Sequence, residues 1–222
     1  MGILRFQETG CRTASADRSA HRKREKGSAM KRICVFCGSS AGAKPSYLAT
    51  ARDFGRELAA RELGLVYGGS SVGLMGALAD GALAAGAEVT GVIPRALEVK
   101  ELAHRGVTRL EVVASMHERK ARMAELADGF VALPGGMGTL EELAEILTWA
   151  QLGLHRKPCA LLDVAGYWGP LVVFFDHAVQ ERFLRAEHRA NLLVGAEPAA
   201  LLDAMERWHP ALQERWIGRG DT

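Results

Sequence analysis

The sharpest chemical signal in the chain is the glycine-rich run Pro134-Gly135-Gly136-Met137-Gly138-Thr139, which follows a short apolar stretch. Glycine lets the backbone turn tightly and approach a ligand without Cβ clashes, and proline cannot extend a β-ladder. We expect Thr139 to cap the following helix, whose free amides and positive dipole suit a phosphate. A plain helix cap is the alternative, but it would require neither the proline nor three glycines.

Two familiar nucleotide-binding patterns do not fit this run. No lysine follows the last glycine, so the run is not a Walker A loop. The spacing is not G-x-G-x-x-G, and no acidic residue ends the second expected strand (64–67) to hold a ribose diol. The run therefore predicts a phosphate-binding loop, but not that of a dinucleotide-dependent dehydrogenase.

Two carboxylates, Glu141 and Glu142, follow the loop, and we expect them in the first turn of its helix. Complementing the helix dipole would be a sufficient structural reason for acidic residues there. A bound phosphate would repel them, however, which favours a role on the sugar. Glycosidic cleavage passes through an oxocarbenium-like state that a carboxylate stabilises while it polarises a water molecule. We therefore interpret this pair as the candidate catalytic group.

Two adjacent cations, Arg119 and Lys120, lie near the start of another expected helix, at the carboxyl end of the strand before it. Arginine binds phosphate bidentately, and lysine adds a point charge. A solvated, charged helix face is the alternative. The position at a helix start, facing the expected anion site, favours a functional role for both residues. His117, beside them, could equally be a cap.

The elements that would position these residues alternate along the chain. Expected strands span 33–37, 64–67, 88–93, 107–113, 129–133, 158–163 and 191–194, and expected helices span 45–62, 74–85, 117–127, 139–152 and 168–183, before a final helix. This order predicts an α/β fold, a Rossmann-like doubly wound parallel sheet in a single domain (30–222). The strands are continuously apolar, as expected when helices cover both faces. Glycine turns after Cys37, Tyr67 and Leu133 would meet at the ligand-binding carboxyl edge.

The composition narrows the class of protein. The chain has 222 residues, 48% hydrophobic and 24% charged, which is ordinary for one globular domain. A net charge of +2 gives no reason to expect a nucleic-acid partner. No apolar stretch of about 18 residues predicts a membrane span. Residues 1–29 are basic and lack an apolar signal core, so we expect a disordered leader or an alternative start at Met30.

The cysteines are Cys11, Cys34, Cys37 and Cys159. Cys34 and Cys37 form a C-x-x-C, but they lie in an apolar run, and no second pair or histidine follows at metal-ligand spacing. We therefore expect a buried strand there rather than a metal or redox site. Free thiols fit a reducing cytoplasm.

Four segments taken together resemble the Lonely Guy family of cytokinin-activating phosphoribohydrolases. They are Val66-Tyr67-Gly68-Gly69 with Gly73-Leu74-Met75-Gly76; Gly91-Val92-Ile93-Pro94; Met116-His117-x-Arg119-Lys120; and Pro134-Gly135-Gly136-x-Gly138-Thr139-x-x-Glu142. The resemblance runs from about residue 31 to the last helix. It implies hydrolysis of a cytokinin riboside 5′-monophosphate to the free base and ribose 5-phosphate, often with AMP nucleosidase activity, and no metal or organic cofactor.

The resemblance also implies roles for individual residues. Arg119 and Glu142 match the catalytic positions. The nucleotide-binding positions are matched by Glu101, Lys120, Gly136, Met137, Gly138, Thr139, Leu140, Glu141, Thr148 and the segment 149–153. Met137 departs from the family, because many relatives carry tyrosine there. Glu101 lies in a less regular stretch of the sequence.

Several alternatives stay open at this point. A non-catalytic nucleotide carrier or sensor on the same fold is the second hypothesis, because a fold alone does not determine function. The preferred base substituent, and hormone production as against nucleotide salvage, are undecided. Similar proteins were long labelled lysine decarboxylases. We expect no such activity, because that chemistry usually needs pyridoxal phosphate on a buried lysine, and the lysines here fall at element ends or in loops.

We also expect a homodimer or a larger homo-oligomer. The helices expected at 139–152 and 168–183 carry apolar residues on more than one face. A helix that flanks a sheet needs only one buried face, so a symmetric self-contact would cover the surplus. The resemblance likewise implies a dimer with its active site near the subunit boundary. Coverage of that surface by the C-terminal helix of the same chain is the alternative.

Overall fold

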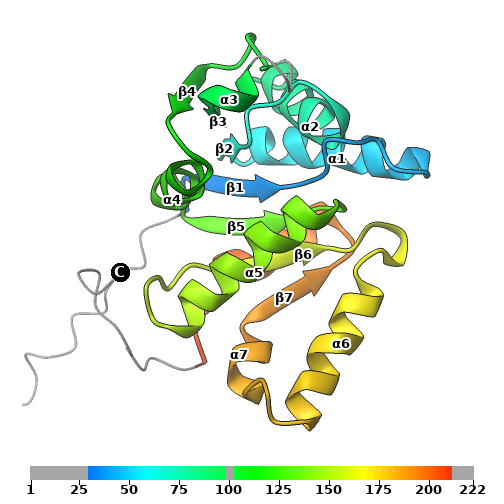
Figure 1. Ribbon diagram of the computed structural model, residues 1–222. Helices are drawn as coiled ribbons and strands as arrows, with labels where there is room; N and C mark the ends of the chain where they lie inside the picture. The colour runs from blue at the N-terminus through cyan, green and yellow to red at the C-terminus, as the bar shows by residue number, and fades with distance from the viewer. Residues whose placement is uncertain (1–29, 99–102, 212–222) are drawn as a thin grey trace, which may run out of the picture.

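The computed structural model describes residues 30–98 and 103–211, and these ranges form a three-layer α/β domain (Figure 1). Its seven-stranded sheet has the order β4-β3-β2-β1-β5-β6-β7, and every neighbouring pair is parallel. The strands are β1 (Arg32–Phe36), β2 (Gly64–Tyr67), β3 (Val89–Pro94), β4 (Arg109–Val113), β5 (Gly129–Ala132), β6 (Cys159–Leu162) and β7 (Leu192–Gly195). The predicted doubly wound fold is confirmed.

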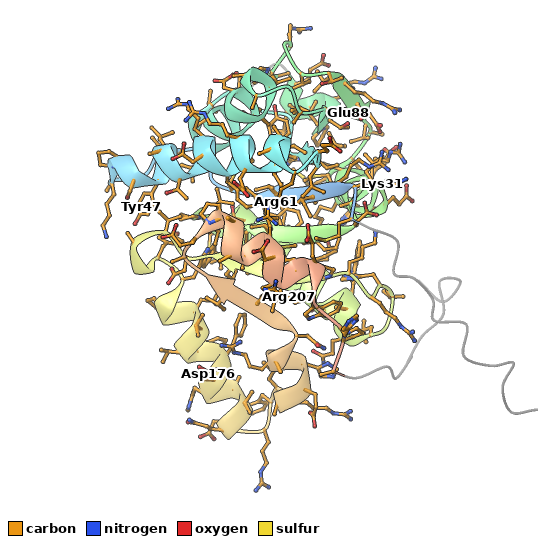
Figure 2. The ribbon with its side chains drawn as sticks, turned by 180° about the vertical axis from the view of Figure 1, so that it is seen from behind. Lys31, Tyr47, Arg61, Glu88, Asp176 and Arg207 are labelled. Atoms are coloured by element: carbon orange, nitrogen blue, oxygen red, sulfur yellow. The ribbon has the colours of Figure 1, made fainter. Side chains whose placement is uncertain are left out.

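Helices cover both faces of this sheet. They are α1 (Pro45–Ala60), α2 (Gly73–Ala84), α3 (Arg95–Glu98), α4 (Met116–Leu126), α5 (Met137–Gln151), the 3₁₀ turn η1 (Val164–Gly166), α6 (Gly169–Gln180), α7 (Ala186–Ala190) and α8 (Pro198–Glu206). One core joins α1, α2 and α8 to the sheet, and the other joins α4, α5 and α6 to it. Figure 2 shows α1 and α8 in front of the sheet, with Arg61 between them; its Nη1 lies 2.6 Å from Asp203 Oδ1.

The central strands are buried on both sides, as their apolar sequences predict. Successive residues of β1 point to opposite faces: Ile33 and Val35 join the first core, and Cys34 and Phe36 join the second. Edge strand β4 instead carries an exposed arginine. Charges on an edge strand discourage pairing with another chain.

The start of α5 differs from the prediction. The helix begins at Met137 with Gly136 as its N-cap residue, so Thr139 is not the cap. Thr139 is instead a buried residue within the first turn, and Glu141 and Glu142 consequently lie in the second turn rather than the first. The extended backbone of Gly136 (φ −95°, ψ −151°) lets the loop enter the helix directly, without a side-chain cap.

Other differences concern short elements. The short elements α3, α7 and η1 were not predicted, because a few residues give no readable helical period. Helix α6 ends at Gln180 rather than at 183, and Arg182 adopts a left-handed conformation (φ 64°) just beyond its end. The predicted leader, residues 1–29, lies outside the described residues.

The described cysteines fit the predicted strand interior. Cys34, Cys37 and Cys159 are free and buried, and burial raises the pKa of Cys159 to about 12. Among the helices of the described ranges, none has the length and apolar character needed to cross a membrane.

Candidate functional site

Three glycine turns meet at the carboxyl edge of the sheet, as predicted. They follow β2, β1 and β5, which are neighbours in the strand order. Backbone hydrogen bonds join them: Gly38 N donates to Pro134 O at 3.0 Å, and Leu74 N donates to Gly38 O at 3.0 Å. Gly73 is left-handed (φ 59°), and a Cβ there would collide with the backbone of Ser39. The turns therefore pack at distances that side chains would prevent.

The glycines after β5 serve two purposes. Gly135 is packed against Gly38 and the Thr139 side chain, and a Cβ on it would lie 2.9 Å from Gly38 N. Gly136 and Gly138 are exposed, and a Cβ on either would meet no atom within 4 Å. The first glycine is thus required for packing, whereas Gly136 and Gly138 leave open space around the first turn of α5. The first N–H groups of a helix lack intrahelical acceptors, so this open end can receive an anion.

Arg119 on α4 is buried, with 6% of its surface exposed. Its Nε donates to Val92 O at 3.0 Å, and its Nη2 donates to Gly68 O at 2.9 Å. The guanidinium therefore joins α4 to the ends of β2 and β3. A Cβ on Gly68 would collide with this guanidinium, which explains the glycine there. For Arg119, the alternative of a solvated helix face is wrong.

Lys120 is also buried, with 7% of its surface exposed. Its ammonium is hydrogen-bonded to Glu141 and lies 3.0 Å from Glu145 Oε1. Burial lowers the pKa of Lys120, but the two carboxylates outweigh it and the net pKa is raised. The solvated-face alternative is thus wrong here too, and the cation bridges α4 and α5. Sequence reasoning missed Glu145, although its i, i+4 spacing from Glu141 is a readable signal.

Glu142 is half-buried on the second turn of α5. Its charge acts on the thiol of Cys37, at the end of β1: burial raises the pKa of that thiol most, Glu142 raises it further, and Arg119 lowers it. Glu142 and Arg119 therefore lie within electrostatic reach of the same point at the carboxyl edge. Arg119 bonds Gly68 O in the glycine turn after β2, and Glu142 lies one turn after the glycines that begin α5.

The remaining predicted residues are more scattered. Met137 is 81% exposed beside the loop, Leu140 is half-buried and Glu141 is exposed. The Thr148 hydroxyl donates to Ala144 O at 2.7 Å. At a rise of about 1.5 Å per residue, Thr148 lies about 15 Å farther along α5 than Gly138. Within one chain it therefore does not join the loop.

Two further points complete the placement. Glu101, predicted to bind substrate, lies outside the described residues. Within the described ranges, no group of three or more His, Cys, Asp or Glu side chains is arranged to hold a metal ion. Sequence reasoning also missed Tyr167, whose hydroxyl donates to Gly135 O. No local pattern could have found it, because the two residues come from different loops.

A mostly apolar groove of about 360 Å³ lies between α5 and α6, on the second core's side of the sheet. It is lined by Thr148, Gln151, Phe174, Phe175 and Phe183, among others. Phe174 and Phe183 are 60% and 89% exposed. Helix α8 does not cover this surface, because its buried residues belong to the first core. Helix α8 itself thus packs on the other face, although Trp208 and Pro210, which follow it, line the groove.

Known proteins resemble this chain over most of its length. The profile of a family described as "possible lysine decarboxylase" matches residues 75–205. Cytokinin riboside 5′-monophosphate phosphoribohydrolase LOG7 of Arabidopsis thaliana is 49% identical over 187 residues, which is 84% of this chain and 86% of the relative. The probable cytokinin riboside 5′-monophosphate phosphoribohydrolase LOGL6 of Oryza sativa subsp. japonica is 49% identical over 183 residues, covering 82% and 73%.

Solved structures share the fold at lower identity. The molybdenum cofactor carrier protein of Chlamydomonas reinhardtii superposes with a TM-score of 0.60 at 25% identity, covering 78% of this chain and 95% of that one. The molybdenum cofactor binding protein of Rippkaea orientalis gives 0.60 at 22% identity, covering 79% and 95%. The phosphoribohydrolases are nearly half identical to this chain over more than four fifths of its sequence, which is much stronger evidence of a common family than a shared fold. The chain therefore belongs to the cytokinin riboside 5′-monophosphate phosphoribohydrolase family.

Proposed function

We propose that this protein hydrolyses the N-glycosidic bond of adenosine 5′-monophosphate and its N-prenylated forms, releasing the base and ribose 5-phosphate. One observation carries the proposal: a half-buried carboxylate, Glu142, follows the open, glycine-rich N-terminus of α5, and a buried guanidinium, Arg119, bonds the glycine turn after β2 at the same sheet edge. The relatives that are nearly half identical are named for this reaction.

The geometry suggests a role for each part. The amides that begin α5 hold the 5′-phosphate, as helix N-termini hold anions. Glu142 polarises the attacking water and stabilises positive charge on the sugar, as carboxylates do in glycosidic cleavage. Water oxygen bonds to the anomeric carbon as the bond to the base breaks, and the base leaves with a proton. Arg119, held by two carbonyl oxygens, orients the substrate. This chemistry requires no metal or organic cofactor.

A nucleotide carrier remains the second candidate. Solved proteins with the same fold are described as molybdenum cofactor carriers, which favours a binding function for the fold in general. Their identity with this chain is half that of the phosphoribohydrolases, and a shared fold does not transfer function. The two candidates differ in one observable, which is whether the nucleotide is consumed.

The test is incubation of purified protein with AMP, isopentenyl-AMP or adenosine, followed by mass spectrometry of the products. We expect adenine and ribose 5-phosphate from AMP and faster release of the prenylated base. Adenosine should react far more slowly, because phosphate binding positions the sugar. Unconsumed nucleotide that stays bound would support a carrier. Equal rates on adenosine and AMP would refute the anchoring role of the glycine loop.

We further propose a homodimer formed through the groove between α5 and α6. The exposed Phe174 and Phe183 support it, because a symmetric contact would bury them. The position of Thr148 also fits it. The resemblance implies that Thr148 contacts nucleotide, and it lines this groove about 15 Å along α5 from the loop, where a partner chain would bring a second site close to it. Light scattering tests this proposal: the 23.9 kDa chain should give about 48 kDa or a higher multiple. Phe174→Asp should shift the mass toward the monomer.

We also propose a cytoplasmic location. Its support is that the three cysteines of the described ranges are buried free thiols, which suits a reducing compartment. Fractionation of the source cells with an antibody to the chain would test it.

A further inference from the structure

The loop between β6 and α6 presents Tyr167 at the catalytic edge. Ala165 (φ 54°) and Gly166 (φ 75°) are both left-handed, a conformation that an L-residue such as alanine adopts only at a cost. The next residues are anchored: Trp168 N donates to Asp163 Oδ1 at 2.7 Å, and Trp168 Nε1 donates to Ala132 O at 3.2 Å. The strained turn and the buried tryptophan together determine where residue 167 stands.

Tyr167 connects three loops at that edge. Its hydroxyl donates to Gly135 O in the glycine loop after β5. Its ring meets the ring of Tyr47 edge-on, with centroids 5.9 Å apart. Tyr47, labelled at the start of α1 in Figure 2, packs on the turn after β1, where a Cβ on Gly42 would lie 2.6 Å from its ring. Tyr167 is still 38% exposed, so it stands at the surface of the site.

We propose that Tyr167 is a positioning residue that orients the amide of Gly136 toward the substrate phosphate. A peptide unit is planar and trans, so its C=O and N–H point in opposite directions. Holding the carbonyl of Gly135 therefore also holds the N–H of Gly136. Because glycine flanks this peptide on both sides, the unit can rotate at little steric cost. The phenol selects one of its orientations. This inference rests on the proposed phosphate-binding role of the loop.

The geometry of the hydrogen bond from Tyr167 to Gly135 O suits a positioning role rather than a catalytic one. The hydroxyl bonds the side of the peptide opposite to the amide that would meet the anion. Loss of the hydroxyl should therefore weaken phosphate binding and leave the chemical step largely intact. The ring contacts with Tyr47 and Trp168 do not depend on the hydroxyl, so the fold should survive its removal.

The test is Tyr167→Phe in the full-length protein, with Tyr47→Phe as the matched control. Tyr47 loses the same hydroxyl from the neighbouring ring, but that hydroxyl does not bond the loop. We expect Tyr167→Phe to raise KM for AMP, and Kd for ribose 5-phosphate measured by calorimetry, by roughly tenfold, the scale of one lost hydrogen bond. The kcat and Tm should stay near those of the unsubstituted protein. Tyr47→Phe should change neither constant.

The outcomes separate this inference from the proposed function. If the unsubstituted protein binds ribose 5-phosphate but cleaves no AMP, and Tyr167→Phe weakens that binding, the inference stands without the enzyme. If AMP is cleaved and Tyr167→Phe keeps the original KM and Kd, the inference is overturned and the enzyme stands. A fall in Tm and kcat at constant Kd would make Tyr167 merely structural and overturn it too. So would a protein that binds no ribose 5-phosphate at all.

Discussion

The ammonium of Lys120 on α4 lies 3.0 Å from a carboxylate oxygen of Glu145 on α5, and it also bonds Glu141 one turn earlier. Lys120 is nearly inaccessible, whereas Glu141 is exposed and Glu145 is partly exposed. Lys120 thus links α4, which carries Arg119, to α5, which carries Glu142, through two ion pairs. A buried cation with one partner removed is costly, because its desolvation is no longer compensated.

A double-mutant cycle should measure this link. We expect Lys120→Met and Glu145→Gln each to lower the free energy of unfolding by about 1–3 kcal/mol. The double variant should lose less than the sum by roughly 1 kcal/mol or more, because the two residues contact each other. Urea denaturation gives all four values. Strict additivity would show that the pair contributes no coupling.

Glu142 should carry the chemical step. Glu142→Gln keeps the shape of the side chain but removes its charge, so we expect turnover of AMP to fall on the order of a hundredfold or more while AMP binding is largely kept. Arg119→Ala should harm both, and also stability, because it leaves the carbonyls of Val92 and Gly68 without their donor. Glu141→Gln is measured beside it to tell which carboxylate of the pair is the base. If Glu142→Gln turns over normally, Glu141 or another group is the base.

Substitution of Gly68 should lower turnover nearly as much as substitution of Arg119. Gly68→Ala places a methyl group against the guanidinium, which must move from its two carbonyl acceptors. We expect loss of turnover approaching that of the Arg119 variant. Gly169→Ala is a control, because a Cβ there meets no atom within 4 Å. Steady-state kinetics and Tm of both variants decide the point, and a fully active Gly68→Ala protein would contradict it.

His155 should make the free energy of unfolding depend on pH. Its pKa falls from 6.5 to about 4, first because of burial and then because of the positive charge of Lys157, while its bond to Ile146 O opposes the fall. The imidazole accepts from Lys157 N at Nδ1, which leaves Nε2 to donate to Ile146 O at 2.8 Å and indicates the neutral form. Between these pKa values the unfolded chain binds the extra proton, so lowering the pH destabilises the folded state.

The size of this effect can be measured. Stability from the neutral ring should be fully present above about pH 6.5 and lost as the pH falls to about 4, by on the order of 3 kcal/mol. In urea titrations at several pH values, His155→Gln should show a shallower slope over that window. If the free energy of unfolding changed with pH in parallel for the two proteins, His155 would not be the cause of the pH dependence.

We expect no lysine decarboxylase activity, despite the description of the matching family. A Schiff base with pyridoxal phosphate needs a neutral amine, and Lys120 is buried against two carboxylates that raise its pKa. Protein mixed with pyridoxal phosphate should show no absorbance of a bound Schiff base and should release no carbon dioxide from lysine. Either signal would reopen that assignment.

The order of elements and the place of the glycine turns could be predicted from the sequence alone. Apolar runs bounded by glycine are local signals, and parallel strands must bring their carboxyl ends to one edge. The turns after β1, β2 and β5 therefore met as expected.

Only the tertiary structure decided which side chains face one another there. In the structure Lys120 pairs with Glu145, and the Tyr167 hydroxyl donates to Gly135 O. The N-cap of α5 is Gly136 rather than the predicted Thr139, and Thr148 lies far from the loop. These outcomes depend on the rotation of each helix about its axis and on the exact entry of a loop. Both are set by packing between segments distant in sequence, and a local pattern does not contain that information.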